Sequence, residues 1–250
     1  MPRYQITIEY DGRNFCGWQR QKNALGVQEV IESAIFKVCG ESVSVFGGGR
    51  TDAGVHALGQ VAHMDISKYF EAGTVRDALN NYLRPHPISI VRANNVPTTF
   101  HARFSAVERS YLYRIQNRRA PLAIEKGLVW WVPSTLNVAA MNKAAKQLVG
   151  YHDFSTFRSS GCQAKSPLKT LNALIVERRD SELIEIRASA RSFLYKQIRN
   201  IVGSLRLVGE GKWPPIKLKE ALQACDRKAG GATAPPDGLY LTGIRYNNEQ

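Results

Sequence analysis

Hydrophobic and polar positions in the first half of the chain follow strand and helix periods in turn. Alternation with a period of two predicts strands, whereas an apolar stripe that recurs every three or four residues predicts an amphipathic helix. Over residues 27–39 the positions sharing such a stripe are Val27, Val30, Ile31, Ala34, Ile35 and Val38. The pattern predicts strands at residues 3–10, 43–46, 60–66 and 88–96 and helices at residues 27–39 and 74–83.

The resulting order is strand, helix, strand, strand, helix, strand. This is the ferredoxin-like, or split βαβ, arrangement, which is also the plan of many RNA-binding sheets. We therefore expect an α+β fold with mainly antiparallel sheets. Asp52 falls in the loop between the second and third strands. In an enzyme of this plan the sheet can hold RNA while that loop carries the chemistry.

The second half repeats this order of elements with additions. Alternating Tyr111, Tyr113 and Ile115 predict its first strand. The elements expected after it are a helix at 139–148, strands at 171–178 and 183–190, a long helix at 192–208, a shorter helix, and a last strand at 239–246. We expect two ferredoxin-like halves, residues 1–105 and 106–250, with a ligand cleft between them.

Composition favours a polyanionic partner. The 34 lysines and arginines exceed the 21 acidic residues, which gives a formal net charge of +13. Such a charge points to nucleic acid, although a solvated basic surface is the alternative. A length of 250 residues with 44% hydrophobic residues is enough for a substantial core and one or two domains.

Neither cysteine nor histidine spacing indicates a metal site. The cysteines lie far apart and outside any C-x-x-C pair, so we expect reduced structural thiols; they are Cys16, Cys39, Cys162 and Cys225. The histidines lack the helical i, i+4 spacing of zinc ligands, and no metal is expected. Without a leader-like amino terminus or a long apolar run, the default expectation is a cytoplasmic protein with no membrane association.

The glycine-rich run Gly47–Ala57, with the sequence GGGRTDAGVHA, displays one carboxylate, Asp52, near a single arginine, Arg50. Glycine allows tight turns and close approach of the backbone to a ligand. A phosphate loop needs Lys and Ser or Thr after its glycines, and a dinucleotide fingerprint needs a third glycine where Asp52 stands, so both patterns fail. Residue types alone leave open a catalytic aspartate or one that stabilises its own turn.

The run GGGRTDAGVHA resembles the signature of the TruA family of tRNA pseudouridine synthases, which carries the catalytic aspartate of that fold. Further segments resemble the family in the family's order and span nearly the whole chain. They are IEYDG at 8–12, FCGWQRQ at 15–21, FHARFSA at 100–106, RSYLYR at 109–114, DFSTFR at 153–158, FLYKQIRNIVG at 193–203 and GLYL at 238–241. So many matches in order make coincidence a poor explanation.

The resemblance implies the pseudouridine synthase fold and isomerisation of uridine to pseudouridine at positions 38, 39 and 40 of the tRNA anticodon stem-loop. The N-glycosidic bond breaks and a C5 to C1′ bond forms, with no cofactor. Asp52 is implied to be essential, and the resemblance leaves open whether it attacks C1′ or C6 or removes the 2′ proton. The family acts as a homodimer, so we expect a homodimer that binds tRNA.

The resemblance also assigns roles to other residues. Arg199 matches the arginine that pairs with the catalytic aspartate, and a nearby cation keeps an enclosed carboxylate ionised. Tyr111 matches the tyrosine that stacks on the target base and is a candidate proton relay. Leu239 matches a wall of the uracil pocket. On pattern alone, Arg199 would lie on a solvated helix face and Tyr111 in a core.

Broad substrate choice by the family favours recognition of RNA shape and phosphates. We expect Arg50, Arg103 and Arg158 to contact the substrate. Further candidates for backbone contacts are Arg109, Arg114, Arg118 and Arg119. Lys169 stands where the family usually has arginine, so one charged contact loses its bidentate geometry.

Two other classes of protein remain as alternatives. A non-enzymatic RNA-binding module would suit the charge and element order, but its aromatic RNP1 run is absent and Asp52 would have no purpose in it. A phosphate-binding metabolic enzyme would use the glycine run, which fails the tests for both phosphate-binding motifs.

Overall fold

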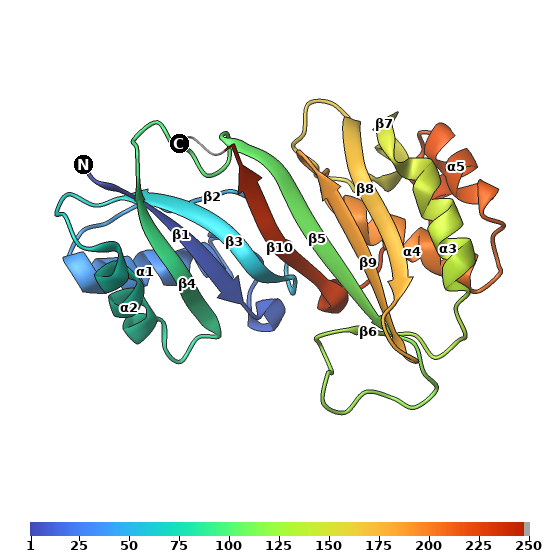
Figure 1. Ribbon diagram of the computed structural model, residues 1–250, viewed down its shortest axis with the longest axis horizontal. Coiled ribbons are helices and arrows are strands. Elements are labelled where there is room, and N and C mark those ends of the chain that lie inside the picture. Colours follow the sequence, from blue (N-terminus) through green and yellow to red (C-terminus); the bar gives the residue numbers. More distant parts are fainter. Residues whose placement is uncertain (248–250) are drawn as a thin grey trace. The chain divides into compact units, whose positions relative to one another are not determined.

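The computed structural model describes residues 1–247 and divides into two compact units. Unit 1 comprises Met1–Arg109 together with the chain from Tyr240 onward, and unit 2 comprises Ser110–Leu239. In each unit, helices pack on a mainly antiparallel sheet (Figure 1). The expected α+β class with mainly antiparallel sheets is confirmed.

Unit 1 has the strand order of the split βαβ plan. Strand β1 lies between β4 and β3 and pairs with both in antiparallel fashion, and β2 pairs with β3. The elements are β1 (Arg3–Tyr10), α1 (Val27–Cys39), β2 (Phe46–Gly47), β3 (His56–Asp65), α2 (Ala72–Leu83) and β4 (Ile88–Val96). The order β4-β1-β3-β2 confirms the ferredoxin-like arrangement predicted for this half.

Two short pairings share the second edge of β3. Residues Phe46 and Gly47 of β2 pair with the carboxyl-terminal part of β3, and β10 (Leu239–Tyr246) runs parallel to its first residues. In the β10 pairing, Tyr240 lies opposite His56. The glycine-rich run begins at Gly47, which pairs with β3, and ends at Ala57, which belongs to β3. Both ends of the run are therefore held by the same strand.

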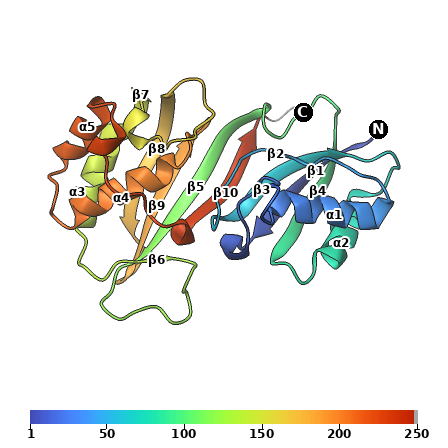
Figure 2. The ribbon, with the colours of Figure 1, turned by 180° about the vertical axis from the view of Figure 1, so that it is seen from behind.

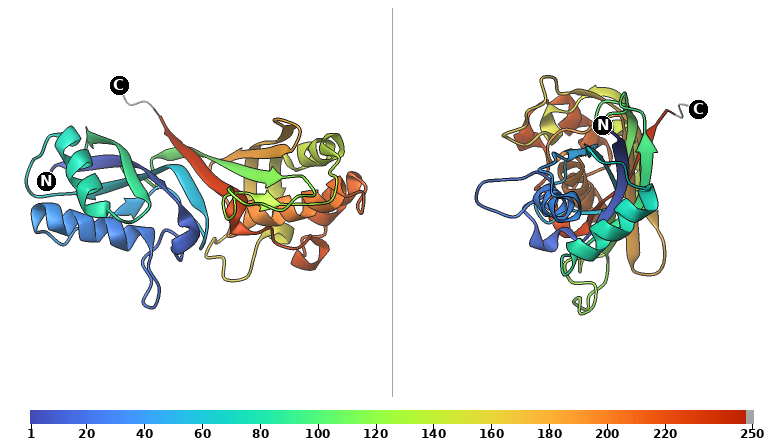
Figure 3. Two further views of the ribbon diagram at one scale, coloured as in Figure 1. Left: turned by 90° about the horizontal axis from the view of Figure 1, so that it is seen from below. Right: turned by 90° about the vertical axis from the view of Figure 1, so that its left-hand side faces the viewer.

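The core of unit 1 follows from the alternation in β1. Tyr4, Ile6 and Ile8 of this strand are completely buried. Helices α1 and α2 bury the opposing apolar side chains, which are Val27, Ile31, Ile35, Val75, Leu79 and Leu83. Figure 2, seen from the helix side, shows α1 lying across the strands, and the right-hand view of Figure 3 shows α1 nearly end-on with α2 beside it.

Unit 2 contains strands in the order β5-β9-β8-β7, with β6 paired to β5. The unit boundary falls inside β5, so that strand begins in unit 1. The elements are β5 (Ala106–Gln116), β6 (Trp130–Trp131), α3 (Val138–Ala145), β7 (Gly150–Asp153), β8 (Leu168–Arg178), β9 (Leu183–Ala190), α4 (Gln197–Gly209) and α5 (Ile216–Gln223). Short 3₁₀ helices occupy Gly12–Asn14, Lys146–Leu148, Ser155–Phe157, Arg227–Ala229 and Pro236–Gly238.

Several predicted segments coincide with the structure. The predicted ranges 3–10, 27–39, 88–96, 183–190 and 239–246 are β1, α1, β4, β9 and β10. The predicted strand at 43–46 is wrong except at its last residue, since β2 is only Phe46–Gly47. Strand β7 was not predicted, because four residues are too few to show a period.

The long helix predicted at 192–208 begins instead at Gln197. Lys196 has a left-handed backbone with φ +59°, which cannot continue a right-handed helix. The side chain of Gln197 accepts a hydrogen bond from the backbone N–H of Leu194 at 2.8 Å and fixes this entry. Arg191 and Tyr195 therefore precede the helix, whereas Arg199 and Gly203 lie on it.

The predicted division into residues 1–105 and 106–250 stays a prediction about functional halves. The compact units count the last strand with the first part of the chain, whereas the prediction assigned it to the second. Over residues 1–247, no helix is both long and apolar enough to cross a membrane.

Candidate active site

The glycine-rich run is held at its start by a buried amide. Gln60 on β3 is completely buried, and its side chain exchanges two hydrogen bonds with the backbone of Gly49. The Gly49 N–H donates to Gln60 Oε1 at 3.1 Å, and Gln60 Nε2 donates to the Gly49 carbonyl oxygen at 2.7 Å. Because a buried amide left unpaired is costly, this exchange fixes where the loop leaves the sheet.

Asp52 is the first residue of a tight turn that ends at Val55. The N–H of Val55 donates to the carbonyl oxygen of Asp52 at 3.1 Å, and Gly54 has φ +78°. A positive φ at the third residue is the requirement of a type II turn, which glycine meets without strain. The side chain of Asp52 is half-buried. The turn thus presents one carboxylate on a backbone that has little freedom.

Two glycines from the amino-terminal segments pack directly against this turn. A Cβ on Gly17, whose φ is +99°, would lie 2.5 Å from the carbonyl oxygen of Thr51. A Cβ on Gly12 would lie 2.0 Å from the carbonyl oxygen of Val55. The N–H of Trp18 also donates to the Thr51 carbonyl at 3.2 Å. Only glycine permits such close approach, so residues 8–21 buttress the backbone on both sides of Asp52.

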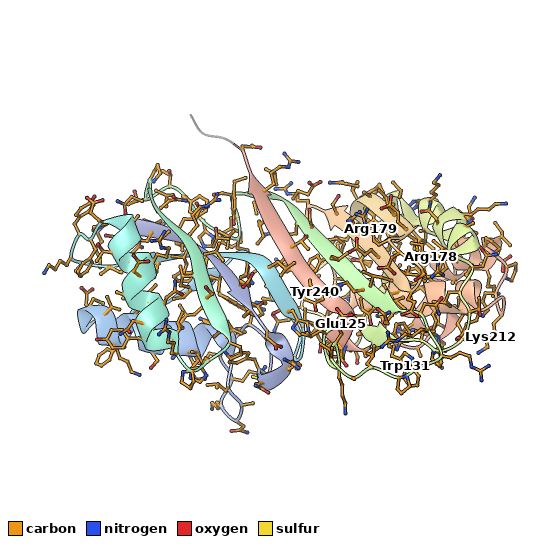
Figure 4. The ribbon with its side chains drawn as sticks, turned by 60° about the horizontal axis from the view of Figure 1, so that its bottom comes forward. Glu125, Trp131, Arg178, Arg179, Lys212 and Tyr240 are labelled. Carbon is orange, nitrogen blue, oxygen red and sulfur yellow. The ribbon has the colours of Figure 1, made fainter. Side chains whose placement is uncertain are left out.

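A polar cluster lies at the end of the turn. His56 is 1% exposed, its ring stacks on Tyr240 with centroids 4.7 Å apart, and its Nδ1 accepts the N–H of Gly12 at 3.1 Å. Asp11 Oδ1 lies 3.2 Å from the same nitrogen. Burial alone would raise the pKa of Asp11, but hydrogen bonds from Arg13 outweigh it and lower the pKa below its usual value. Tyr240 is labelled on β10 in Figure 4.

In unit 2, Tyr111 is buried and Arg199 is half-buried. Tyr111 on β5 is 9% exposed and meets the ring of Phe193 edge-on at 5.2 Å. Arg199 lies in the first turn of α4, where its Nε donates to the carbonyl oxygen of Ala234 at 2.8 Å. The N–H of Ala234 donates back to the Arg199 carbonyl at 3.0 Å. The first bond fixes the guanidinium, and the second fixes the backbone, of a residue that the pattern alone would place in solvent.

Tyr113, two residues after Tyr111 on β5, lies close to Arg199. Burial raises the pKa of the Tyr113 phenol well above its usual value, although the positive charge of nearby Arg199 acts against this rise. A Cβ on Gly238 would lie 2.8 Å from the Tyr113 ring, so only glycine lets this segment pass. Leu239, which follows it, is 5% exposed. Arg199 and Gly238, the residue before Leu239, therefore lie close to the same buried tyrosine.

The arginines expected to contact RNA differ in setting. Arg50 and Arg103 are exposed, and Arg158 is half-buried with Nη2 donating to the carbonyl oxygens of Cys162 at 2.9 Å and Ala164 at 2.8 Å. Arg158 therefore also shapes the loop that follows it.

Further along the chain, Arg114 pairs with Glu125 at 2.9 Å. Glu125 and Trp131 are labelled in Figure 4. Arg118 pairs with Glu182 at 3.2 Å. Both arginines are partly exposed, so pairing with a carboxylate competes with any phosphate contact.

Arg109 has a different role from the one expected. Its side chain is buried, and its guanidinium donates to the carbonyl oxygens of Gly48 and Arg103. It supports two loops of unit 1. The sequence did not predict this role, because an arginine in a strand gives no signal of burial. It did not predict the packing of Gly12 and Gly17 either, because that packing depends on contacts between residues far apart in the chain.

The predicted site residues fall in different units. Asp52, Arg50 and Arg103 belong to unit 1, whereas the rest belong to unit 2: Tyr111, Arg158, Arg199 and Leu239. The pairing of Asp52 with Arg199 stays a prediction. Within residues 1–247 no group of three or more histidine, cysteine or acidic side chains could hold a metal ion.

Comparison with known proteins gives a consistent result. The family model described as tRNA pseudouridine synthase matches residues 6–105 and 144–247. A tRNA pseudouridine synthase A from Paramagnetospirillum magneticum is 56% identical over 247 residues, covering 99% of this chain and 96% of its own. That of Rhodospirillum rubrum is 55% identical over 249 residues, covering 100% and 89%. That of Sinorhizobium fredii is 56% identical over 248 residues, covering 98% and 100%.

Among solved structures, the crystal structure of the archaeal box H/ACA sRNP Nop10-Cbf5 complex matches with a TM-score of 0.35 and 9% identity. The match covers 81% of this chain and 43% of that one.

Proposed function

This chain belongs to the family of tRNA pseudouridine synthases, isomerases that act on uridine in tRNA, and from that premise we propose that it modifies positions 38, 39 and 40 of the anticodon stem-loop with Asp52 as the essential carboxylate. The observation that carries the assignment of Asp52 is the convergence of three family-like segments on one turn. Gly12 and Gly17 lie in two of these segments and press against the backbone of the third. A turn buttressed in this way holds its carboxylate in a defined direction, as catalysis requires.

The proposed reaction rearranges bonds without oxidation. The target nucleotide leaves its stack and enters the pocket. The bond from N1 to C1′ breaks, the uracil turns while it remains bound, and a bond from C5 to C1′ forms. The proton on C5 is lost and N1 gains one, so substrate and product are isomers. Asp52 adds to C1′ or to C6, or removes the 2′ proton to give a glycal; its contribution is to the sugar or the ring in each case.

Residues of unit 2 complete the proposed pocket. Arg199 pairs with Asp52 and keeps the carboxylate ionised while the base and sugar enclose it. Tyr111 stacks on the uracil and relays the C5 proton, and Leu239 forms a wall. The low exposure of Tyr111 and Leu239 supports this assignment, because a detached base is retained by an enclosed apolar surface.

Recognition of the RNA rests on cations. Arg50 and Arg103 are exposed and suited to phosphate contacts, and Arg158 is half-buried beside a loop. The net charge of +13 supports binding of a polyanion. We include in the proposal a homodimer with tRNA lying across both subunits.

The test is tritium release from tRNA labelled at uridine C5. Asp52→Asn should abolish release while binding of the same tRNA persists. Asp77→Asn is the control, because Asp77 is an exposed aspartate of α2 that pairs with Arg76. Substrates that carry uridine at only one of positions 38, 39 and 40 show which of these positions is modified. A folded wild type that binds these tRNAs without releasing tritium would contradict the proposed reaction. An Asp52→Asn variant of normal activity would contradict the role of Asp52.

A further inference from the structure

An exposed aromatic and basic cluster lies on unit 1, outside the residues assigned to the uridine pocket. We call Phe46, His101, Arg103 and Phe104 the Phe104 patch. Phe104 is 72% exposed and Phe46 is 50% exposed, although both are large apolar side chains. The rings of His101 and Phe104 lie 4.4 Å apart, and those of His101 and Phe46 lie 5.9 Å apart. The three rings therefore form one continuous surface.

The patch carries positive charge at its edge. The guanidinium carbon of Arg103 lies 5.6 Å from the centre of the Phe104 ring. Burial, followed by the positive charges of Arg3 and Arg103, lowers the pKa of His101. An aromatic face bordered by cations favours a ligand that is flat, apolar on its faces and negatively charged at one end.

Four hydrogen bonds hold the patch in this arrangement. His101 Nδ1 accepts the backbone N–H groups of Arg103 at 3.2 Å and Phe104 at 3.3 Å. Below it, His63 Nδ1 accepts the N–H of Ala102 at 3.2 Å. The hydroxyl of Tyr246 donates to the carbonyl oxygen of Ala102 at 2.8 Å. A surface loop fixed by so many bonds loses little entropy when a ligand binds.

The patch is also coupled to the glycine-rich run. Phe46 directly precedes that run, and Arg109 donates to the carbonyl oxygens of both Gly48 and Arg103. A ligand on the patch would thus contact elements that are fixed relative to the turn carrying Asp52, within the same unit.

We propose that the Phe104 patch binds an unpaired nucleotide of the tRNA other than the reacting uridine, with its base stacked on Phe104 and its phosphate on Arg103. The inference rests on the proposed function. RNA is the occupant because its unpaired bases supply flat apolar faces and its backbone supplies the anion, which matches the local charge and the net charge of the chain. A second copy of this chain, which is itself strongly basic, lacks that complementarity.

The first experiment measures tRNA affinity and KM for patch variants. Phe104→Ala should weaken tRNA affinity and raise KM, each by roughly 5- to 150-fold, the equivalent of ~1 to 3 kcal/mol per stacked base. Phe104→Trp should restore affinity because it keeps an aromatic face. The control is Phe36→Ala, since Phe36 is 55% exposed on α1 of the same unit and lies outside the patch. Equal tRNA affinity for Phe104→Ala and wild type overturns the proposal.

The second experiment looks for stacking directly. A base stacked on the new indole should quench the added fluorescence of Phe104→Trp when tRNA is present, whereas Phe36→Trp should show no such quenching. Loss of self-association in Phe104→Ala at unchanged tRNA affinity per subunit would overturn the proposal by making the patch a protein interface. The two hypotheses fail separately: an absence of tritium release from wild type refutes the isomerase reaction, whereas tRNA affinity tests the patch whether or not release occurs.

Discussion

The guanidinium of Arg109 forks onto the carbonyl oxygen of Gly48, with Nε at 3.0 Å and Nη2 at 2.7 Å. The same Nη2 donates to the carbonyl oxygen of Arg103 at 2.8 Å. One buried cation thus joins the start of the glycine-rich run to the loop that precedes β5. The fork needs a planar group with several donors in fixed directions, which lysine lacks.

Arg109→Lys should therefore loosen both loops while keeping the charge. We expect the free energy of unfolding to fall by ~1 to 3 kcal/mol, since buried carbonyls lose donors. Activity should fall more through kcat than through tRNA affinity, because Arg109 acts by positioning the run that carries Asp52. Urea unfolding and tritium release measure the two effects. Arg92→Lys, at an exposed position of β4, is the comparison and should change neither; an Arg109→Lys variant as stable as wild type would contradict the role assigned here.

The approach of Gly17 to the Thr51 carbonyl can be tested by adding one methyl group. Gly17→Ala places a Cβ 2.5 Å from that oxygen at φ +99°, whereas Gly40→Ala adds a methyl at φ +75° with nothing within 4 Å. Gly40→Ala should cost ~1 kcal/mol of backbone strain. Gly17→Ala should cost at least ~1 kcal/mol more and lower the rate of tritium release, because the turn must move. Comparing the thermal unfolding of the two variants separates the effect of the clash at Thr51 from that of backbone strain. An equal loss of stability in both would show that Gly17 is not tightly packed against Thr51.

Stability should fall as the pH is lowered from about 7 to 4. Burial, followed by the charges of His101 and Arg3, lowers the pKa of His63 from 6.5 to about 4. Between these pH values the unfolded chain binds a proton that the folded chain does not, so the free energy of unfolding rises with pH. The contribution of His63 to stability is therefore lost as the pH falls through this window. The loss amounts to at most ~3 kcal/mol.

His63→Asn tests this origin, because its side-chain oxygen can accept the Ala102 N–H in place of Nδ1 and does not titrate. Urea unfolding at pH 7 and at pH 5 should show a smaller difference for the variant than for wild type. The same difference in both proteins would assign the pH dependence to other groups.

Tyr111→Phe separates stacking from proton transfer. The variant keeps the ring and its edge-on contact with Phe193, so tRNA affinity should stay near that of wild type. If the hydroxyl relays the C5 proton, kcat should fall by ~10²- to 10⁴-fold. Single-turnover tritium release gives the rate, and filter binding gives the affinity. A variant with full rate would leave Tyr111 with stacking alone.

The elements with clear periods could be predicted because their burial is set by neighbours in sequence. Strand β1 and helix α1 have the predicted limits, since Ile6 and Ile8 alternate and Ile31 and Ile35 recur at helical spacing. The start of α4 could not be predicted, because the left-handed backbone of Lys196 depends on bonds made by its surroundings. The two residues of β2 were equally hidden, since their pairing with β3 is not encoded in any local period.

The sequence by itself determined the family, the order of elements in unit 1 and the placement of Asp52 in a glycine-rich loop, because these depend on local pattern and on a motif read in order. Only the tertiary structure decided that Gly12 and Gly17 press against the Asp52 turn, that Arg109 is buried, and that Tyr240 stacks on His56. These last relationships join residues far apart in the chain. Their energies come from close packing and from pairing of buried polar groups, which exist only once the fold has formed.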